Sequence, residues 1–186
     1  MNDVVKLIRQ AEGLLTRLER LLPNEAPSTD WNASIAFRWR KRDARGVIEP
    51  VKHVHRIALR DLQGIDAQKE LVEQNTRQFV EGFPANNVLL TGARGTGKSS
   101  LIKSLLNKYA PRGLRLIEVE KQDLVDLSDI VDRIYQRPER FILYCDDLSF
   151  EADDPRFKAL KVVLDGSIAA ATDNCVIYAT SNRRHL

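Results

Sequence analysis

The chain has 186 residues, of which 43% are hydrophobic, so it can bury one good core with a small appendage. Its formal net charge of +3 is too small to require a nucleic-acid partner. Both cysteines lie in apolar runs, which favours core positions over a disulfide or metal pair. No apolar stretch approaches the ~20 residues of a membrane span, and the N-terminus lacks a signal-peptide layout. We therefore expect a cytoplasmic protein.

The first predicted element is an amphipathic helix over residues 3–22, whose apolar residues form one stripe. Asp3 can cap its start, and Pro23 ends it. The stripe fits packing on the body of the protein, but its heptad spacing also fits a partner helix. A linker over residues 23–30 follows, so residues 1–30 are predicted to form an N-terminal unit.

A basic β-hairpin is predicted within residues 31–58. Phe37 and Trp39 alternate with arginines along its first strand, and Pro50 marks its second strand as an edge. Residues 38–60 hold eight Lys or Arg and two acids, a local charge of +6. Arginines between aromatic residues can hold a nucleic-acid backbone and stack on bases. A solvated basic face with its aromatic side docked on the core fits the same pattern, so both interpretations stay open.

Residues 59–186 alternate between strand and helix patterns, which predicts a parallel sheet with right-handed crossovers. Strands are expected over residues 87–91, 114–119, 141–145 and 175–179, and helices over residues 67–81, 99–106, 127–136 and 156–171. The first helix is expected to face the core with four apolar residues, Leu71, Val72, Phe79 and Val80.

The segment Gly92–Ser99 fits the phosphate-binding pattern G-x-x-x-x-G-K-[ST] between a predicted strand and a predicted helix. Glycines let the backbone curl and aim its N–H groups at phosphate oxygens, and the helix N-terminus adds its dipole. Lys98 is expected to reach the β- and γ-phosphates, and the Ser99 hydroxyl to hold Mg²⁺. We therefore expect a nucleoside triphosphate, bound by Gly92, Ala93, Arg94, Gly95, Thr96, Gly97, Lys98, Ser99 and Ser100.

Polar side chains also follow two other predicted strands. Asp146 and Asp147 end an apolar run, and Asn182 follows the last strand. Open α/β sheets place ligands at the carboxyl ends of their strands, so these side chains are expected to meet the phosphate loop. Asp146 is expected to bind Mg²⁺ together with Ser99. Asp147 would orient or deprotonate the attacking water, and Asn182 would contact that water or the γ-phosphate. The predicted catalytic residues are Asp147, Asn182 and Lys98.

These three motifs resemble Walker A, Walker B and sensor 1 of the AAA+ ATPases, a likeness carried by Gly92–Ser99, Asp146-Asp147 and Thr180–Arg183. The resemblance implies ATP and Mg²⁺ as cofactors. Residues 61–71 are similar to the segment that precedes the AAA+ core and lines its adenine pocket, which implies nucleotide contact for Ile65.

Two further runs narrow the resemblance. The Asp-Asp-Leu sequence at residues 146–148 is similar to the replication-initiator and helicase-loader branch. Residues 85–90 and 179–186 are most similar to predicted bacterial AAA+ ATPases known only as a domain of unknown function. In the AAA+ family the core continues into an arginine finger, a fifth strand, a second sensor and a helical lid. The chain is therefore expected to be a fragment with weak activity.

The predicted fold class is α/β, a P-loop NTPase with a parallel sheet of about four strands and flanking helices. An N-terminal helix and a β-hairpin precede its AAA+-like core, which spans residues 59–186. The first candidate function is the ATP-binding module of an AAA+-type ATPase, whose complete form, as a homo-oligomer, hydrolyses ATP to remodel a partner. The alternative is a nucleotide-gated module that binds nucleic acid through residues 35–60 with little or no hydrolysis. A GTPase or small-molecule kinase is disfavoured because no Asn-Lys-x-Asp guanine-reading motif is present.

Overall fold

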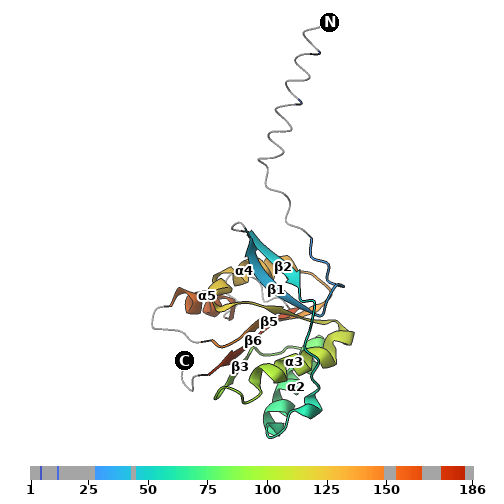
Figure 1. Cartoon of the computed structure of the whole chain (residues 1–186), viewed down its shortest axis with the longest axis vertical. Coiled ribbons are helices and arrows are strands. Elements are labelled where there is room, and N and C mark those ends of the chain that lie inside the picture. The colour runs from blue at the N-terminus through green and yellow to red at the C-terminus, as the bar shows by residue number, and fades with distance from the viewer. Residues whose placement is uncertain are drawn as a thin grey trace.

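A six-stranded sheet lies between two layers of helices in the computed structural model of the chain (Figure 1). The structure describes residues 5, 12, 28–42, 45–148, 154–164 and 173–182. The predicted helix over residues 3–22 falls almost entirely outside them, so it stays a prediction. The strand order is β2-β1-β4-β5-β6-β3, and every neighbouring pair is parallel except β1 with β2.

The observed elements follow the predicted alternation of strands and helices. The strands are β1 (Ala36–Arg42), β2 (Arg45–Pro50), β3 (Val88–Thr91), β4 (Leu114–Glu118), β5 (Arg140–Cys145) and β6 (Cys175–Ser181). The α-helices are α2 (Asp66–Val80), α3 (Lys98–Tyr109), α4 (Leu127–Ile134) and α5 (Pro155–Leu164). Three short 3₁₀ helices connect them, η1 (Leu59–Asp61), η2 (Ala110–Arg112) and η3 (Lys121–Asp126). The α/β fold class with a mainly parallel sheet is therefore confirmed.

The strand count exceeds the predicted four because the β-hairpin belongs to the same sheet. Strand β1 pairs in parallel with β4, which aligns Phe37 with Ile117. The side chains of Phe37 and Trp39 are buried, and the Phe37 ring lies 4.7 Å from that of Trp31. The Trp31 ring in turn lies 5.0 Å from that of Phe141 on β5. The aromatic side of the hairpin thus packs into the core, and β2 with Pro50 forms the edge, as its sequence predicted.

Apolar side chains fill both faces of the sheet. One cluster lies under η3, α4 and α5 and includes the buried Cys145, and the other lies under α2 and α3. The prediction that Leu71 faces the core is wrong, because its side chain is 70% exposed. Helix α2 buries Val72, Thr76 and Phe79, and position 71 is turned by roughly 100° from position 72.

Among the described residues, no helix combines the length and apolar character that crossing a bilayer requires.

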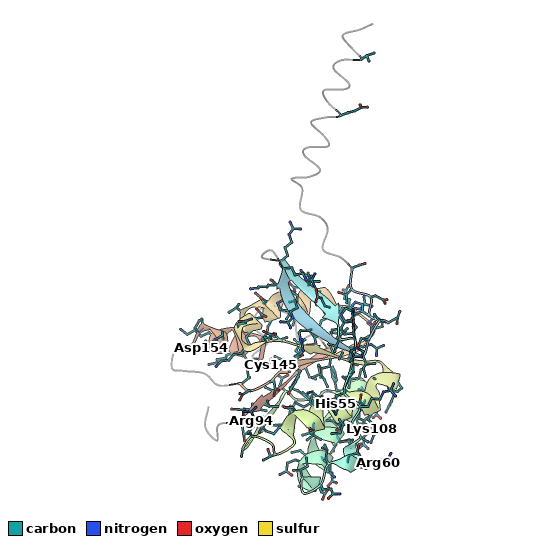
Figure 2. The ribbon with its side chains drawn as sticks, viewed as in Figure 1. His55, Arg60, Arg94, Lys108, Cys145 and Asp154 are labelled. Carbon is teal, nitrogen blue, oxygen red and sulfur yellow. The ribbon has the colours of Figure 1, made fainter. Side chains whose placement is uncertain are left out.

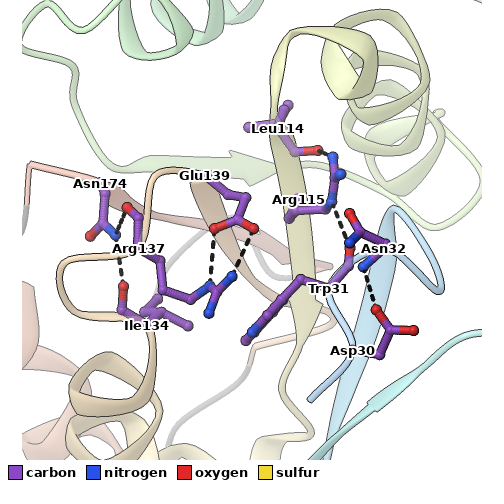
Figure 3. A network of polar contacts seen from close by, with 9 residues as sticks. All are labelled: Asp30, Trp31, Asn32, Leu114, Arg115, Ile134, Arg137, Glu139 and Asn174. Carbon is purple, nitrogen blue, oxygen red and sulfur yellow. Dashed lines mark hydrogen bonds and ion pairs between the residues drawn. The ribbon is translucent and has the colours of Figure 1, made fainter. Parts of the chain in front are cut away.

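Polar contacts cluster around the loops that lead into β5 and β6 (Figure 3). Arg137 donates two hydrogen bonds of 3.0 Å to Glu139, and its guanidinium lies 5.0 Å from the Trp31 ring. The Asn174 amide donates to the carbonyl oxygens of Ile134 and Arg137 at 2.8 and 3.2 Å. These bonds tie together the two loops that lead into β5 and β6.

Candidate nucleotide site

The carboxyl ends of β3, β5 and β6 meet at one edge of the sheet and border a cleft of about 400 Å³. Its lining residues are Arg94, Gly95, Thr96, Gly97, Lys98, Ser99, Ser100, Asp146, Asp147, Thr180 and Asn182. Figure 2 shows Arg94 at this edge. The structure therefore gathers most of the predicted site residues, which come from three separate parts of the sequence. Gly92 and Ala93, at the start of the loop, are not among the lining residues.

The phosphate loop takes the conformation that its glycines allow. Gly92, Gly95 and Gly97 have φ angles of 147°, 83° and 83°, a region that residues with side chains rarely adopt. Helix α3 begins at Lys98, with the Gly97 carbonyl accepting its first hydrogen bond from Leu101 at 2.8 Å. A Cβ added to Gly97 would lie 3.8 Å from the Ile65 side chain. The predicted adenine contact Ile65 is therefore close to the loop, just outside the cleft lining.

The Lys98 ammonium lies within the curl of the loop. Its Nζ donates to the carbonyl oxygens of Gly92 and Ala93, both at 2.8 Å, and to Oδ1 of Asn182 at 3.1 Å. The loop and the end of β6 are thus joined through one cation. The backbone also joins them, because the Gly92 N–H donates to the Ser181 carbonyl at 3.2 Å.

Asp146 and Ser99 both line the cleft, and their side chains contact each other. Ser99 Oγ donates to Asp146 Oδ1 at 3.0 Å, and the Thr180 hydroxyl donates to the same oxygen. Partial burial opposes ionisation of this carboxylate, but the polar groups of Thr180, Tyr144 and Ser99 outweigh it and lower the pKa below its ordinary value. A carboxylate beside a hydroxyl is the kind of oxygen pair that Mg²⁺ prefers.

Asp147 leaves the regular strand geometry. Its φ is 53°, in the left-handed region that is uncommon for residues with a side chain. Successive residues of a strand point to opposite faces, so a regular strand would send Asp146 and Asp147 apart. The turn at Asp147 instead lets both carboxylates line the cleft, and the Asn182 amide donates to Asp147 Oδ1 at 2.6 Å. Asn182 therefore contacts both Lys98 and Asp147.

The sequence-based prediction missed two residues beside this site. Thr180 lines the cleft and is only 2% exposed. It belongs to the run Thr180–Arg183 that carries the likeness to sensor 1, but the sequence assigned it no role of its own. Tyr144 lies on β5 two residues before Asp146, so it shares that face of the sheet. Its hydroxyl is buried without a hydrogen bond of normal geometry among the described residues, and burial raises its pKa.

Acidic side chains lie beside many of the cations in the basic run at residues 38–60. Among the described residues, five of its eight cations are in ion pairs: Arg38–Glu118, Arg40–Glu120, Lys41–Asp126 and Arg42–Glu49 at 2.6 to 2.9 Å, and Arg60–Asp61 at 3.9 Å. The end of the run turns away from the hairpin, because Asn107 of α3 donates to the carbonyl of His55 at 3.0 Å. Figure 2 accordingly shows His55 and Arg60 beside α2 and α3. The described contacts therefore do not favour a single nucleic-acid-binding face.

Comparison with known protein families identifies the family of the chain. The model of a family described as "Protein of unknown function (DUF815)" matches residues 32–186. The chain belongs to this family. No curated protein sequence matches it. The membership agrees with the expected likeness to bacterial proteins known only as a domain of unknown function.

Three solved structures are similar to parts of the chain. A lysine-to-arginine mutant of Thermotoga maritima RuvB is 16% identical, with a TM-score of 0.50, over 70% of this chain and 43% of that one. AMPPCP-bound DnaA from Aquifex aeolicus is 19% identical, with a TM-score of 0.47, over 65% and 39%. C. elegans PCH-2 is 21% identical, with a TM-score of 0.47, over 72% and 40%. The DUF815 chain thus shares the fold of the RuvB structure. It spans about two fifths of the length of each of these three structures.

Proposed function

We propose that this chain is the ATP-binding module of an AAA+-type ATPase, which in its complete, homo-oligomeric form hydrolyses ATP with Mg²⁺ to remodel a partner. One observation carries the proposal. The hydrogen-bonded series Lys98–Asn182–Asp147 lies beside the Ser99–Asp146 pair in one cleft. The cleft therefore combines a cation that can bind phosphate (Lys98), an oxygen pair that can bind a metal (Ser99 and Asp146) and a carboxylate that can act on water (Asp147).

The chemistry of the cleft suits a nucleoside triphosphate. The N-terminus of α3 and the glycine-rich turn before it offer backbone N–H groups to phosphate oxygens. A volume of about 400 Å³ falls within the range of small-molecule sites. Ser99 and Asp146 are the residues that would hold Mg²⁺, which when bound would neutralise charge on the phosphate oxygens. Ile65, next to Gly97, offers an apolar surface for the base.

The remaining side chains supply positioning and proton transfer. Lys98 exchanges the loop carbonyls for the β- and γ-phosphate oxygens. Asp147 accepts a proton from the attacking water or orients it. Asn182 contacts both groups, so it couples the position of Lys98 to that of Asp147. Because Asp is one methylene shorter than Glu, its reach toward the water depends on the backbone turn at Asp147.

Lys98→Ala is the variant that tests nucleotide binding, measured with a fluorescent ATP analogue. Lys98 makes several charge-assisted hydrogen bonds, each of about 1.5–3 kcal/mol, so we expect affinity to fall about 100-fold or more. Lys161→Ala is the matched control, because Lys161 is exposed on α5 outside the cleft. Equal affinity of wild type and Lys98→Ala contradicts the proposal. Preference for GTP over ATP in the same assay indicates a GTPase or kinase instead.

Asp147→Asn separates binding from hydrolysis. We expect ATP affinity close to wild type and loss of phosphate release, because the amide cannot take a proton from water. Asp132→Asn, an exposed change on α4, should leave both quantities unchanged. Unchanged phosphate release in Asp147→Asn removes this residue from the mechanism. The same preparations also test the nucleic-acid alternative. Electrostatic binding to phosphates lowers the logarithm of the affinity by about 0.7–0.9 per contact for each tenfold rise in salt concentration. We expect the affinity of the chain for nucleic acid to show no such dependence on salt.

A further inference from the structure

Thr180 lies near the end of β6, next to the residues that follow β5. It lies on β6, the strand between β3 of the phosphate loop and β5 of the paired acids, and opposite Leu90 in the register with β3. Its side chain is 2% exposed, yet it borders the cleft. A hydroxyl buried at that position must satisfy its hydrogen-bonding capacity on neighbouring groups.

Both hydrogen-bonding capacities of this hydroxyl are directed at the paired acids. The Thr180 hydroxyl donates to Asp146 Oδ1, the oxygen that also accepts from Ser99. The same Oγ1 accepts the backbone N–H of Asp147 at 2.9 Å. The Thr180 carbonyl accepts the N–H of Leu148 at 2.7 Å, so three consecutive residues after β5 are held from β6.

These bonds account for the unusual backbone of Asp147. A left-handed conformation is unfavourable for a residue with a Cβ and persists only where the surroundings hold it. Here the N–H groups of Asp147 and Leu148, one on each side of the turn, are both bound to Thr180. The turn then brings the Asp147 carboxylate to Asn182.

We propose that Thr180 is a positioning residue, whose single hydroxyl orients Asp146 for the metal and holds the backbone turn that aims Asp147 into the cleft. The inference rests on the proposed Mg·ATP function. It adds a residue on β6 that orients the metal ligand Asp146. Ser at this position keeps both bonds, whereas Val keeps the shape and loses both.

The test uses the full chain and measures binding rather than turnover. A fluorescent ATP analogue is titrated in EDTA, and Mg²⁺ is then titrated into the nucleotide complex. Removing a group that orients a metal ligand typically costs 10- to 100-fold in metal affinity. For Thr180→Val we therefore expect the half-saturating Mg²⁺ concentration to rise at least about tenfold. Nucleotide affinity in EDTA should stay within about twofold of wild type, because Thr180 orients the metal ligand rather than the phosphate loop.

Two further variants make the result specific. Thr180→Ser should match wild type within about threefold, since it retains the donor and the acceptor. Thr76→Val removes another buried hydroxyl, which bonds to the Val72 carbonyl and to Tyr178 away from the cleft, and should leave the Mg²⁺ dependence unchanged. If Thr180→Val fails to fold, the Ser variant still decides, because a large rise in its half-saturating Mg²⁺ concentration would show that the methyl group, not the hydroxyl, matters.

The outcomes separate this inference from the function on which it rests. Wild-type Mg²⁺ dependence in Thr180→Val, or an equal loss in Thr76→Val, overturns the role of Thr180 and leaves the ATPase proposal intact. Absence of nucleotide binding by the wild-type chain overturns both.

Discussion

Phe37→Ala tests whether the β-hairpin is part of the nucleotide-binding body. The Phe37 side chain is fully buried, and its ring lies 4.7 Å from Trp31 and beside the β4 pairing. Truncating a buried Phe to Ala costs about 3–5 kcal/mol, a large share of the roughly 5–15 kcal/mol that stabilises a typical domain. For a chain of this size the loss corresponds to a fall in Tm of about 6–20 °C. Phe83→Ala is the matched control, because Phe83 is 62% exposed and its loss should cost no more than about 0.5 kcal/mol.

Urea unfolding followed by two probes gives the decisive measurement. The chain has two tryptophans, Trp31 and Trp39, and both lie in the aromatic cluster of the hairpin. Tryptophan fluorescence therefore reports on this region, while far-UV circular dichroism reports mainly on the helices. We expect both transitions to coincide in wild type and to shift together in Phe37→Ala. A fluorescence transition well before the dichroism transition, or a loss below about 1 kcal/mol, would falsify the shared core.

Two further predictions concern titratable groups. Burial opposes ionisation of Glu139, but its hydrogen bonds with Arg137 prevail and lower the pKa below the ordinary 4.5. The stabilisation from the Glu139 carboxylate is therefore fully present above about pH 4.5 and is lost as pH falls through the lowered pKa. We expect the difference in unfolding free energy between wild type and Glu139→Gln, measured by urea unfolding, to shrink below that pH. A difference that does not change with pH contradicts the lowered pKa of Glu139. Burial raises the pKa of the Cys145 thiol to about 12, and its side chain is fully buried. A Cys175→Ser variant should thus react with a thiol reagent at pH 8 only after unfolding, and rapid labelling of the native protein refutes the burial of Cys145.

Ion pairs on the hairpin illustrate why charge in a sequence is a weak guide to partners. Residues 38–60 carry +6 as a run, yet Arg38 and Arg40 on β1 pair with Glu118, the last residue of β4, and with Glu120 just beyond it. Those glutamates lie 80 residues further along the chain and become neighbours only because β1 pairs with β4 in parallel. These pairs are each about 40% exposed at the arginine, so their main effect is on local charge rather than on stability.

The sequence by itself determined the local features of this protein. Glycine spacing between Gly92 and Ser99 dictates a tight turn into a helix, and apolar runs such as residues 141–145 dictate buried strands. Both signals act over a few residues, because backbone freedom and side-chain period are local properties. The meeting of Asp146 and Asn182 with the phosphate loop also followed, since the carboxyl ends of parallel strands share one edge of a sheet.

Only the tertiary structure decided the contacts between distant strands. The union of the hairpin with the sheet depends on β1 pairing with β4, and the placing of Asp147 depends on a backbone turn held by Thr180. The sequence placed both acids at the cleft because they follow a strand, but regular strand geometry alone would send adjacent side chains to opposite faces. The left-handed turn at Asp147 that brings both into the cleft has no signature in residues 146–148 themselves. Its cause lies on β6, more than thirty residues away, and hydrogen bonds over such a separation form only when the sheet brings the two strands together.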